Sequence, residues 1–239
     1  MSAVAEPLSK RPRLPEWFRL KLPTASAYFA TRNLIDDLNL NTVCESARCP
    51  NHWECWSKGT ATFMIAGDRC TRACGFCAVD TRKPMALEVD EPDRVAEATR
   101  RMKLKHVVIT AVARDDLSDG GASHFKRVIE RVREVNPGVL IEVLTPDFQD
   151  DDSAIDAVIS ARPEIFNHNL ETVRSLTPKV RSVATYARSL SVLAKVKKRV
   201  PGIYTKSGLM LGLGETKEEL LETMADLRSA GCDLLTLGQ

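Results

Sequence analysis

Six short apolar runs recur along the chain from residue 61 onward, each bounded by polar or turn-forming residues. Within a run the apolar side chains follow one another without polar alternation, which is typical of parallel strands covered on both faces. We therefore predict strands over residues 61–66, 106–112, 139–144, 164–170, 203–213 and 233–238.

Amphipathic helix patterns lie between these runs. In residues 123–138 apolar side chains recur at intervals of three and four positions, and the sequence Asn-Pro-Gly ends the pattern. Residues 216–231 open with a Thr-x-x-Glu capping box and end at a glycine. The same periodicity over residues 189–202 predicts a third helix, and a shorter helix precedes the fourth strand.

The alternation of strands and helices indicates an α/β fold with a parallel sheet. A doubly wound sheet would also satisfy the pattern, but the strict succession favours a partial (β/α)6 barrel of the TIM type. Residues 58–239 are predicted to form this barrel, and residues 1–57 an N-terminal extension that carries cysteines. The chain ends together with the sixth predicted strand, which suggests that a C-terminal segment is absent from this sequence.

Composition and charge narrow the possible functions. A chain of 239 residues with 44% hydrophobic side chains can bury one sizeable core or two small ones. Its formal charge of +2 provides no basic field for nucleic acid, and no apolar run approaches the length of a membrane span. The N-terminus lacks the apolar core of a secretory signal. We therefore expect a cytoplasmic protein of bacterial type that binds neither nucleic acid nor membrane.

Six of the seven cysteines fall into two triplets. The first comprises Cys44, Cys49 and Cys55, and the second comprises Cys70, Cys74 and Cys77. Clustered thiols in a reducing compartment indicate metal ligands before disulfides. The second triplet follows the first predicted strand, and barrels of this type place their chemistry at the carboxyl ends of the strands. We expect Gly75 to give this loop the backbone freedom to curl around a metal centre.

Three thiolates leave one iron of a four-iron cluster without a protein ligand. An open position of this kind is where a metal centre performs chemistry. A closed structural zinc site is the alternative interpretation, but it needs a fourth Cys or His at similar spacing, and none follows nearby in the sequence. The second triplet therefore favours a catalytic iron–sulfur cluster.

The spacing Cys-x3-Cys-x2-Cys, with the aromatic Phe76 before its last cysteine, resembles the signature of the radical S-adenosylmethionine superfamily. The resemblance implies that the open iron binds the amino and carboxylate groups of S-adenosylmethionine and that an electron then splits the sulfonium into a deoxyadenosyl radical. It implies that Phe76 lies near the adenine, that Asn169 and Glu171 bind the ribose, and that Gly212 and Glu215 belong to the glycine-rich motif that approaches the adenine. Taken alone, Glu171 could equally cap a helix and the glycines could form an ordinary turn.

The first triplet makes the resemblance more specific. Together with "GDRCTRACGFC", "RDDLSDGGASHF", "HNLETV", "ATYARSL" and "KSGLMLGLGET", it resembles the lipoyl synthase family from about residue 15 to the end. The resemblance implies two 4Fe-4S clusters, a radical-generating one on the second triplet and an auxiliary one on the first. The auxiliary cluster would donate the two sulfur atoms inserted at C6 and C8 of a protein-bound octanoyl-lysine chain. Lys206 and Arg188 are candidates to meet the cofactor carboxylate or the carrier domain.

The resemblance also implies a set of partners. These are octanoylated lipoyl carrier domains (the E2 subunits of 2-oxoacid dehydrogenases and the glycine cleavage H protein), a reductant such as flavodoxin or ferredoxin, and a cluster-assembly carrier. The basic segment over residues 10–21 is a candidate to dock an acidic carrier domain. Two other classes stay open: a tRNA methylthiotransferase, which would need an RNA-binding appendage, and a zinc-bound scaffold without enzymatic activity.

The sequence departs from the family at two places. The family's fourth auxiliary ligand, a serine in an Arg-Ser-Ser motif near the C-terminus, has no counterpart here, and Ser182 is not assigned that role because it is expected beside a helix start. The auxiliary cluster is therefore expected to be labile or capped by water, which puts turnover by this chain in question. Ala111 and Ala113 stand where the family has a hydroxyl and a carboxylate, so cofactor contacts there are in doubt.

Several further residues carry weaker expectations. Trp53 and Trp56 flank Cys55 and are expected to shield the auxiliary cluster from water, with His52 packed nearby. Residues 114–116 are expected to form either a cofactor contact or a salt-bridged loop. Cys232 is expected to be a buried small hydrophobic residue.

Overall fold

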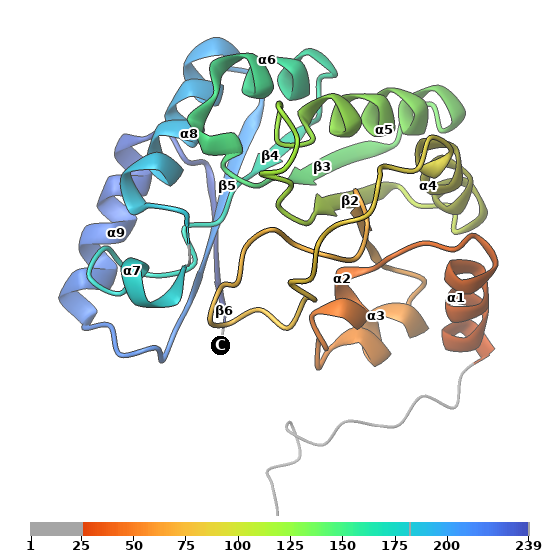
Figure 1. Ribbon diagram of the computed structural model, residues 1–239, viewed down its shortest axis with the longest axis horizontal. Helices are drawn as coiled ribbons and strands as arrows, with labels where there is room; N and C mark the ends of the chain where they lie inside the picture. Colours follow the sequence, from red (N-terminus) through yellow and green to blue (C-terminus); the bar gives the residue numbers. More distant parts are fainter. Residues whose placement is uncertain (1–25, 182, 239) are drawn as a thin grey trace, which may run out of the picture.

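The computed structural model describes residues 26–181 and 183–238 (Figure 1). Six parallel strands form one sheet in the order β1-β2-β3-β4-β5-β6. The strands are β1 (Thr62–Ile65), β2 (His106–Ala111), β3 (Leu140–Leu144), β4 (Ile165–Asn167), β5 (Tyr204–Met210) and β6 (Leu234–Gly238). All six predicted strands are confirmed, although β4 and β5 are shorter than predicted.

The sequential strand order separates a partial barrel from a doubly wound sheet. A doubly wound sheet reverses its strand order at a switch point, whereas here each strand pairs with its neighbours in the chain. Right-handed crossovers that all run the same way keep the helices on one face. Figure 1 shows α4, α5, α6, α8 and α9 along the outside of the curved sheet. The predicted partial (β/α)6 barrel is therefore confirmed.

Five helices cover the sheet: α4 (Glu91–Arg101), α5 (Ala122–Val135), α6 (Asp152–Ser160), α8 (Tyr186–Arg199) and α9 (Lys217–Ser229). The short helix α7 (Thr177–Val180) and a 3-10 turn, η2 (Phe148–Asp150), lie in the loops. The predicted capping box is present at the start of α9, where Thr216 and Glu219 each accept the other's backbone N–H. Helix α4 has no counterpart among the predicted helices, because its buried apolar side chains are small ones, Pro92, Val95, Ala96 and Ala98.

The predicted apolar face of α5 packs on the sheet. Phe125, Val128, Ile129 and Val132 are fully buried in the main core. Burial of each such side chain stabilises the fold by roughly 1.5–3 kcal/mol. This packing fixes the outer layer of helices and so positions the ends of the strands.

Within the described residues before β1, the chain forms three helices, α1 (Ser26–Asp37), α2 (Val43–Ser46) and α3 (His52–Ser57). Helix α1 packs on α3, and the Thr31 hydroxyl donates to the Trp56 carbonyl at 3.0 Å. The segment before α2 joins β1, because Met64 N donates to Asn41 O at 2.8 Å. Tyr28 and Trp56 belong to the same core cluster as the barrel strands. The domain boundary between residues 57 and 58 stays a prediction, and the basic segment over residues 10–21 lies outside the described residues.

Candidate cluster and cofactor sites

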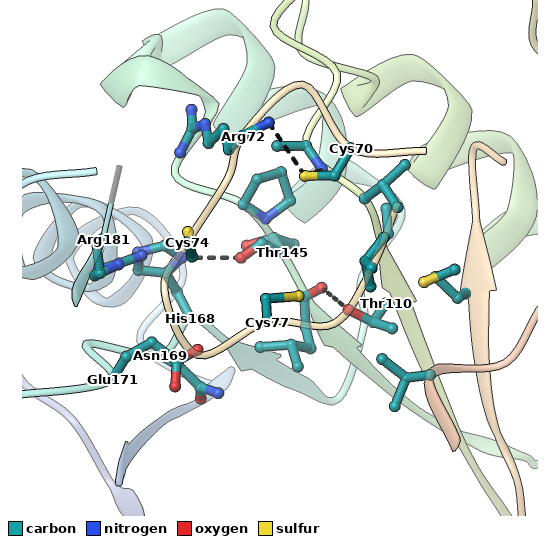
Figure 2. Close-up of a pocket in the computed structure, with 18 of the residues that line it drawn as sticks. Cys70, Arg72, Cys74, Cys77, Thr110, Thr145, His168, Asn169, Glu171 and Arg181 are labelled. Atoms are coloured by element: carbon teal, nitrogen blue, oxygen red, sulfur yellow. Dashed lines mark hydrogen bonds between the residues drawn. The ribbon is translucent and has the colours of Figure 1, made fainter. Parts of the chain in front are cut away.

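A long loop between β1 and α4 carries the second triplet across the carboxyl ends of the strands. This loop closes over a cavity whose walls come from the ends of β1, β2, β3 and β4 and from the segment before α8 (Figure 2). The polar and sulfur-bearing lining residues include Cys70, Arg72, Cys74, Cys77, Thr110, Thr145, His168, Asn169, Glu171 and Arg181. The predicted cofactor residues Phe76, Asn169 and Glu171 all line this cavity.

The thiols of the second triplet are free, and all three line the same cavity. Cys70 Sγ accepts the backbone N–H groups of Arg72 at 3.4 Å and Ala113 at 3.3 Å. Hydrogen bonds of this kind stabilise thiolate sulfur in iron–sulfur sites. Burial raises the pKa of the Cys77 thiol, and the neighbouring Cys70 and Cys74 raise it further.

The spacing of these thiols bears on the kind of centre that they could hold. Within the described residues, no group of three or more His, Cys, Asp or Glu side chains is placed to hold a metal ion. A four-iron cluster makes a different demand, because each thiolate binds a different iron at a separate corner. Cys70, Cys74 and Cys77 line one cavity from separate positions of the loop, which fits that demand.

Arg72 ties the loop to the sheet. Its guanidinium donates two hydrogen bonds to Asp115, each at 2.7 Å, and a third to Asp147 Oδ1 at 2.7 Å. Asp115 also accepts the Thr71 hydroxyl at 2.8 Å. Since Asp115 follows β2 and Asp147 follows β3, the residues between Cys70 and Cys74 are anchored to two strand ends. Asp115 is therefore part of a salt-bridged loop, which was one of the two alternatives predicted for residues 114–116.

One expectation about this loop needs correction. A Cβ at Gly75 would meet Val180 O at 3.7 Å, an ordinary contact, and Gly75 is not in the left-handed region. The expected need for glycine there is therefore wrong. At Ala113 the backbone itself contacts the loop that carries the second triplet. Its N–H reaches Cys70 Sγ, and its carbonyl accepts the backbone N–H and the hydroxyl of Thr71, each at 3.0 Å.

Asn169 and Glu171 form a polar edge of the cavity just beyond β4. Glu171 has a left-handed φ of 69° and its N–H donates to Gly208 O at 2.9 Å, which pins this segment to β5. A Cβ at Gly208 would lie only 2.8 Å from Asn169 Oδ1. Gly208 therefore makes room for the Asn169 side chain, a role the sequence did not reveal. Burial raises the pKa of Glu171, while the charge of Arg181 acts in the opposite direction.

His168 lies behind this edge in a chain of hydrogen bonds. Its Nδ1 lies 2.9 Å from Thr145 O, and because a carbonyl only accepts, Nδ1 carries the proton. Its Nε2 therefore accepts from the Ser189 hydroxyl at 2.9 Å, and Ser189 Oγ accepts from Arg181 Nη1 at 2.7 Å. Burial, the largest cause, lowers the pKa of His168 to about 4, so the ring is neutral.

Four residues with predicted contacts to the cofactor or carrier are absent from the cavity lining. Lys206 pairs with Glu142 at 2.7 Å. Glu215 accepts the backbone N–H of Gly212 at 2.6 Å and closes its own loop after β5. Arg188 donates to Asp147 Oδ2 at 3.3 Å. Contacts between the cofactor and Lys206, Gly212, Glu215 or Arg188 stay predictions.

Two thiols of the first triplet, Cys44 and Cys49, line a second pocket. Cys44 lies in α2 and Cys49 in the following loop, and both line this pocket together with Arg32 and Arg48. Cys55 lies in α3 and packs against the main core. Burial raises the pKa of the Cys55 thiol, and the nearby Cys44 and Cys49 raise it further. Two short helices and the loop between them thus gather these three thiols.

Aromatic residues pack beside the first triplet. The Tyr28 and Trp53 rings stack with centroids 4.7 Å apart, and Trp53 and His52 line the pocket. His52 Nδ1 donates to Cys49 O at 3.2 Å, so His52 packs beside a thiol-bearing segment. Trp53 is 38% exposed, whereas Trp56 is 1% exposed and belongs to the core. The two tryptophans therefore differ in their surroundings.

Helix α2 contributes to the walls of both pockets. Val43 lines the cavity of the second triplet, and the next residue, Cys44, lines the pocket of the first. The remaining cysteine, Cys232, is buried outside both sites, as predicted.

Comparisons with known proteins match both the barrel and the extension. A sequence profile of the radical SAM superfamily matches residues 64–227, and a profile of the N-terminal domain of lipoyl synthase matches residues 2–49. A curated lipoyl synthase of Thermus thermophilus is 57% identical over 227 residues, which cover 94% of this chain and 70% of that protein.

Solved structures resemble the barrel. Methylornithine synthase matches with a TM-score of 0.58 and 14% identity over 89% of this chain and 64% of that chain. SuiB of Streptococcus suis bound to S-adenosylmethionine matches with a TM-score of 0.57 and 11% identity over 73% of this chain and 39% of that chain. This chain thus spans less than two thirds of either structure, and at such identities the likeness shows the fold alone.

Proposed function

Because the chain belongs to the lipoyl synthase family of the radical S-adenosylmethionine superfamily, we propose that it inserts two sulfur atoms, at C6 and C8, into a protein-bound octanoyl-lysine chain. The observation that carries the proposal is that the second triplet lines one cavity while Cys44 and Cys49 of the first line another pocket, with α2 contributing to both walls. A single active centre would not need a second group of free thiols that begins at Cys44, next to Val43 in the wall of the first cavity.

We assign the radical-generating 4Fe-4S cluster to Cys70, Cys74 and Cys77. With S-adenosylmethionine bound, such a cluster supplies a carbon radical able to remove hydrogen from an unactivated C–H bond, which no side-chain base can do. The chain contributes a loop that Arg72 holds in place and an apolar lining that limits the access of water to the reacting atoms. That lining includes Val43, Met64, Val79, Val112 and Leu144.

We assign the auxiliary 4Fe-4S cluster, the sulfur donor, to Cys44, Cys49 and Cys55. The triplet supplies three of the four ligands that such a cluster normally takes. The family's fourth ligand is a serine, and Ser182 lies outside the described residues. A hard oxygen ligand or water at the fourth iron binds more weakly than thiolate in a soft sulfur shell. We therefore expect the auxiliary cluster to be the more labile of the two.

For the nucleoside part of the cofactor we propose Phe76, Asn169 and Glu171. The Phe76 ring is 39% exposed at the cavity, where it can pack on an adenine. The Asn169 amide and the Glu171 carboxyl can hydrogen-bond the ribose hydroxyls. Gly212 and Glu215 would act indirectly, by fixing the loop after β5. Lys206, which is paired with Glu142, would influence cofactor binding without touching the cofactor.

The partners follow from the function of the family. We propose lipoyl carrier domains as substrates, either E2 subunits of 2-oxoacid dehydrogenases or the glycine cleavage H protein. We also propose flavodoxin or ferredoxin as the reductant and a cluster-assembly carrier that rebuilds the auxiliary cluster. Within the described residues, no helix is long and apolar enough to cross a membrane. We propose the cytoplasm as the compartment, because thiols that bind iron need a reducing one.

The test is a sulfur-insertion assay. The anaerobically reconstituted protein is incubated with S-adenosylmethionine, dithionite and an octanoyl-lysine peptide, and mass spectrometry should show a gain of two sulfur atoms. Cys44→Ala is the matched variant, which should still cleave S-adenosylmethionine but add no sulfur. Peptide product without sulfur would contradict the proposal, and sulfur gained only on RNA would favour a tRNA methylthiotransferase.

A further inference from the structure

One arginine beyond β2 holds both ends of the stretch that carries the second triplet. Arg114 donates through Nη1 to Ala66 O at 2.9 Å and through Nη2 to Met85 O at 3.0 Å. Ala66 directly follows β1, and all three cysteines of the second triplet lie between Ala66 and Met85 in the chain. A single guanidinium therefore closes this part of the loop into a ring.

The guanidinium of Arg114 is held in one plane. Its Nε and Nη2 donate to the two carboxylate oxygens of Asp116, each at 2.9 Å, and the Arg114 side chain is only 2% exposed. Such a paired contact fixes the direction of the remaining donors. Arg114 is absent from the lining of the cavity, so it acts on the cysteine loop rather than on a ligand in the cavity.

The backbone at Ala66 needs contacts of this kind. Ala66 has a φ of 67°, in the left-handed region that residues other than glycine seldom adopt. Its N–H donates to Glu91 Oε2 at 2.9 Å, and its carbonyl accepts from Arg114. Glu91 is the first residue of α4, where the loop ends. A sparsely populated conformation persists only where the surroundings impose it, and here Arg114 and Glu91 hold it from opposite sides.

The turn that contains Arg114 also reaches the first cysteine of the triplet. The N–H of the preceding residue, Ala113, donates to Cys70 Sγ at 3.3 Å, and the Arg72 N–H donates to the same sulfur at 3.4 Å (Figure 2). Amide donors on a ligating sulfur raise the reduction potential of an iron–sulfur cluster, because they stabilise its more negative, reduced form. Since Ala113 and Arg114 are consecutive, the anchored arginine keeps this N–H within reach of the sulfur.

We propose that Arg114 is a positioning residue for the radical-generating cluster, an inference that rests on the proposed function. By joining Ala66 to Met85, it keeps the cysteine loop closed before iron binds. By fixing the turn beyond β2, it keeps the Ala113 N–H on Cys70 Sγ when the cluster is present. Arg114 therefore governs both the order of the empty loop and the reduction potential of the loaded one.

The first test uses the metal-free protein. Hydrogen exchange followed by mass spectrometry compares wild type, Arg114→Gln, Arg114→Lys and Arg82→Gln. Arg82 is the matched control, because it lies in the same loop with its side chain 72% exposed. In Arg114→Gln we expect the amides of residues 66–86 to exchange about tenfold faster or more, since two charge-assisted hydrogen bonds are lost. Peptides from α5 should be unchanged.

The two other variants complete this comparison. Arg114→Lys should exchange at a rate between wild type and Arg114→Gln, because an ammonium keeps the charge but not the fork that reaches two carbonyls. Arg82→Gln should match wild type.

The second test measures the reduction potential and the electron paramagnetic resonance spectrum of the loaded loop. Cys44, Cys49 and Cys55 are replaced by alanine in every protein, so that only the second triplet can hold a cluster. Arg114→Gln should lower the potential and change the spectrum, because the Ala113 N–H moves away from the sulfur. Arg114→Lys should restore most of both properties, and Arg82→Gln should alter neither.

Equal loop exchange in Arg114→Gln and Arg82→Gln would overturn the inference. An unchanged potential in Arg114→Gln despite faster loop exchange would also overturn it, because Arg114 would then only stabilise the loop. Asp116→Asn decides the matter if Arg114→Gln does not fold, since the Asp116 side chain is 38% exposed and its loss leaves the arginine in place. Loop exchange in Asp116→Asn should be faster than in wild type, and an equal rate would contradict the inference.

Failure of this inference and failure of the proposed function can be told apart. A wild type that takes up no iron defeats the proposed function and, with it, the effect on the cluster. The exchange measurement needs no iron, so it decides separately whether Arg114 holds the loop.

Discussion

Arg72 and Asp147 form a buried ion pair, with 2.7 Å between Nη2 and Oδ1 and side chains 6% and 0% exposed. Arg72 lies between Cys70 and Cys74, and Asp147 lies beyond the end of β3. Burial alone would raise the pKa of Asp147, but the hydrogen bond and charge of Arg72 lower it to about 2. The pair therefore joins the candidate cluster loop to the sheet in its charged form.

Removal of Arg72 should release this loop. Arg72→Gln leaves Asp147 buried without its main cationic partner, which costs on the order of 3–5 kcal/mol. We expect a lower Tm and weak retention of iron at the second triplet. Arg82→Gln is the control, because Arg82 lies in the same loop with its side chain 72% exposed. Both variants are compared by thermal melts and iron analysis. Equal Tm values and equal iron contents for Arg72→Gln and Arg82→Gln would show that Arg72 does not hold the loop.

The buried neutral ring of His168 should make stability depend on pH. Its pKa is about 4 in the folded protein and about 6.5 when unfolded. Stability is therefore fully present above pH 6.5 and falls as the pH drops towards 4, by on the order of 3 kcal/mol. Urea unfolding of wild type and His168→Asn across this range measures the effect. The difference in unfolding free energy between wild type and His168→Asn should narrow as the pH falls. If it stays constant, His168 does not titrate in this way.

The contact between Gly208 and Asn169 predicts a selective loss of cofactor binding. In Gly208→Ala the new Cβ would lie 2.8 Å from Asn169 Oδ1, so the amide must move. We expect binding of S-adenosylmethionine to weaken by roughly tenfold, the equivalent of one or two hydrogen bonds, with iron content unchanged. Gly202→Ala is the control, since its Cβ would meet no atom within 4 Å. Unchanged dissociation constants for Gly208→Ala would argue against a cofactor role for Asn169.

Much of this fold follows from local patterns in the sequence. The six strands were predictable because a buried parallel strand is a short, uninterrupted apolar run, and the capping box at Thr216 is a contact between residues three positions apart. The cysteine triplets were predictable for a similar reason, since each is compact in sequence. The second triplet also follows β1 directly, which places it at the carboxyl edge of the sheet.

The supporting contacts of the site were not predictable in the same way. Asp147 lies 75 residues from Arg72 in the chain, and no spacing rule links such partners. The role of Gly208 depends on the side chain of Asn169, which lies beside it just beyond the neighbouring strand β4. For Glu215 the sequence motif predicted a cofactor contact, whereas its carboxylate accepts the backbone N–H groups of Gly212 and Leu213 in the same loop.

The central claim is that the two cysteine triplets hold two separate four-iron clusters. Iron and acid-labile sulfide analysis with Mössbauer spectroscopy tests it on anaerobically reconstituted wild type and on two triple variants, each with one triplet replaced by alanine. We predict about eight irons per chain for wild type and about four for either variant, since each cluster holds four. Wild type with only one kind of cluster, or a first-triplet variant that keeps all its iron, would contradict the account.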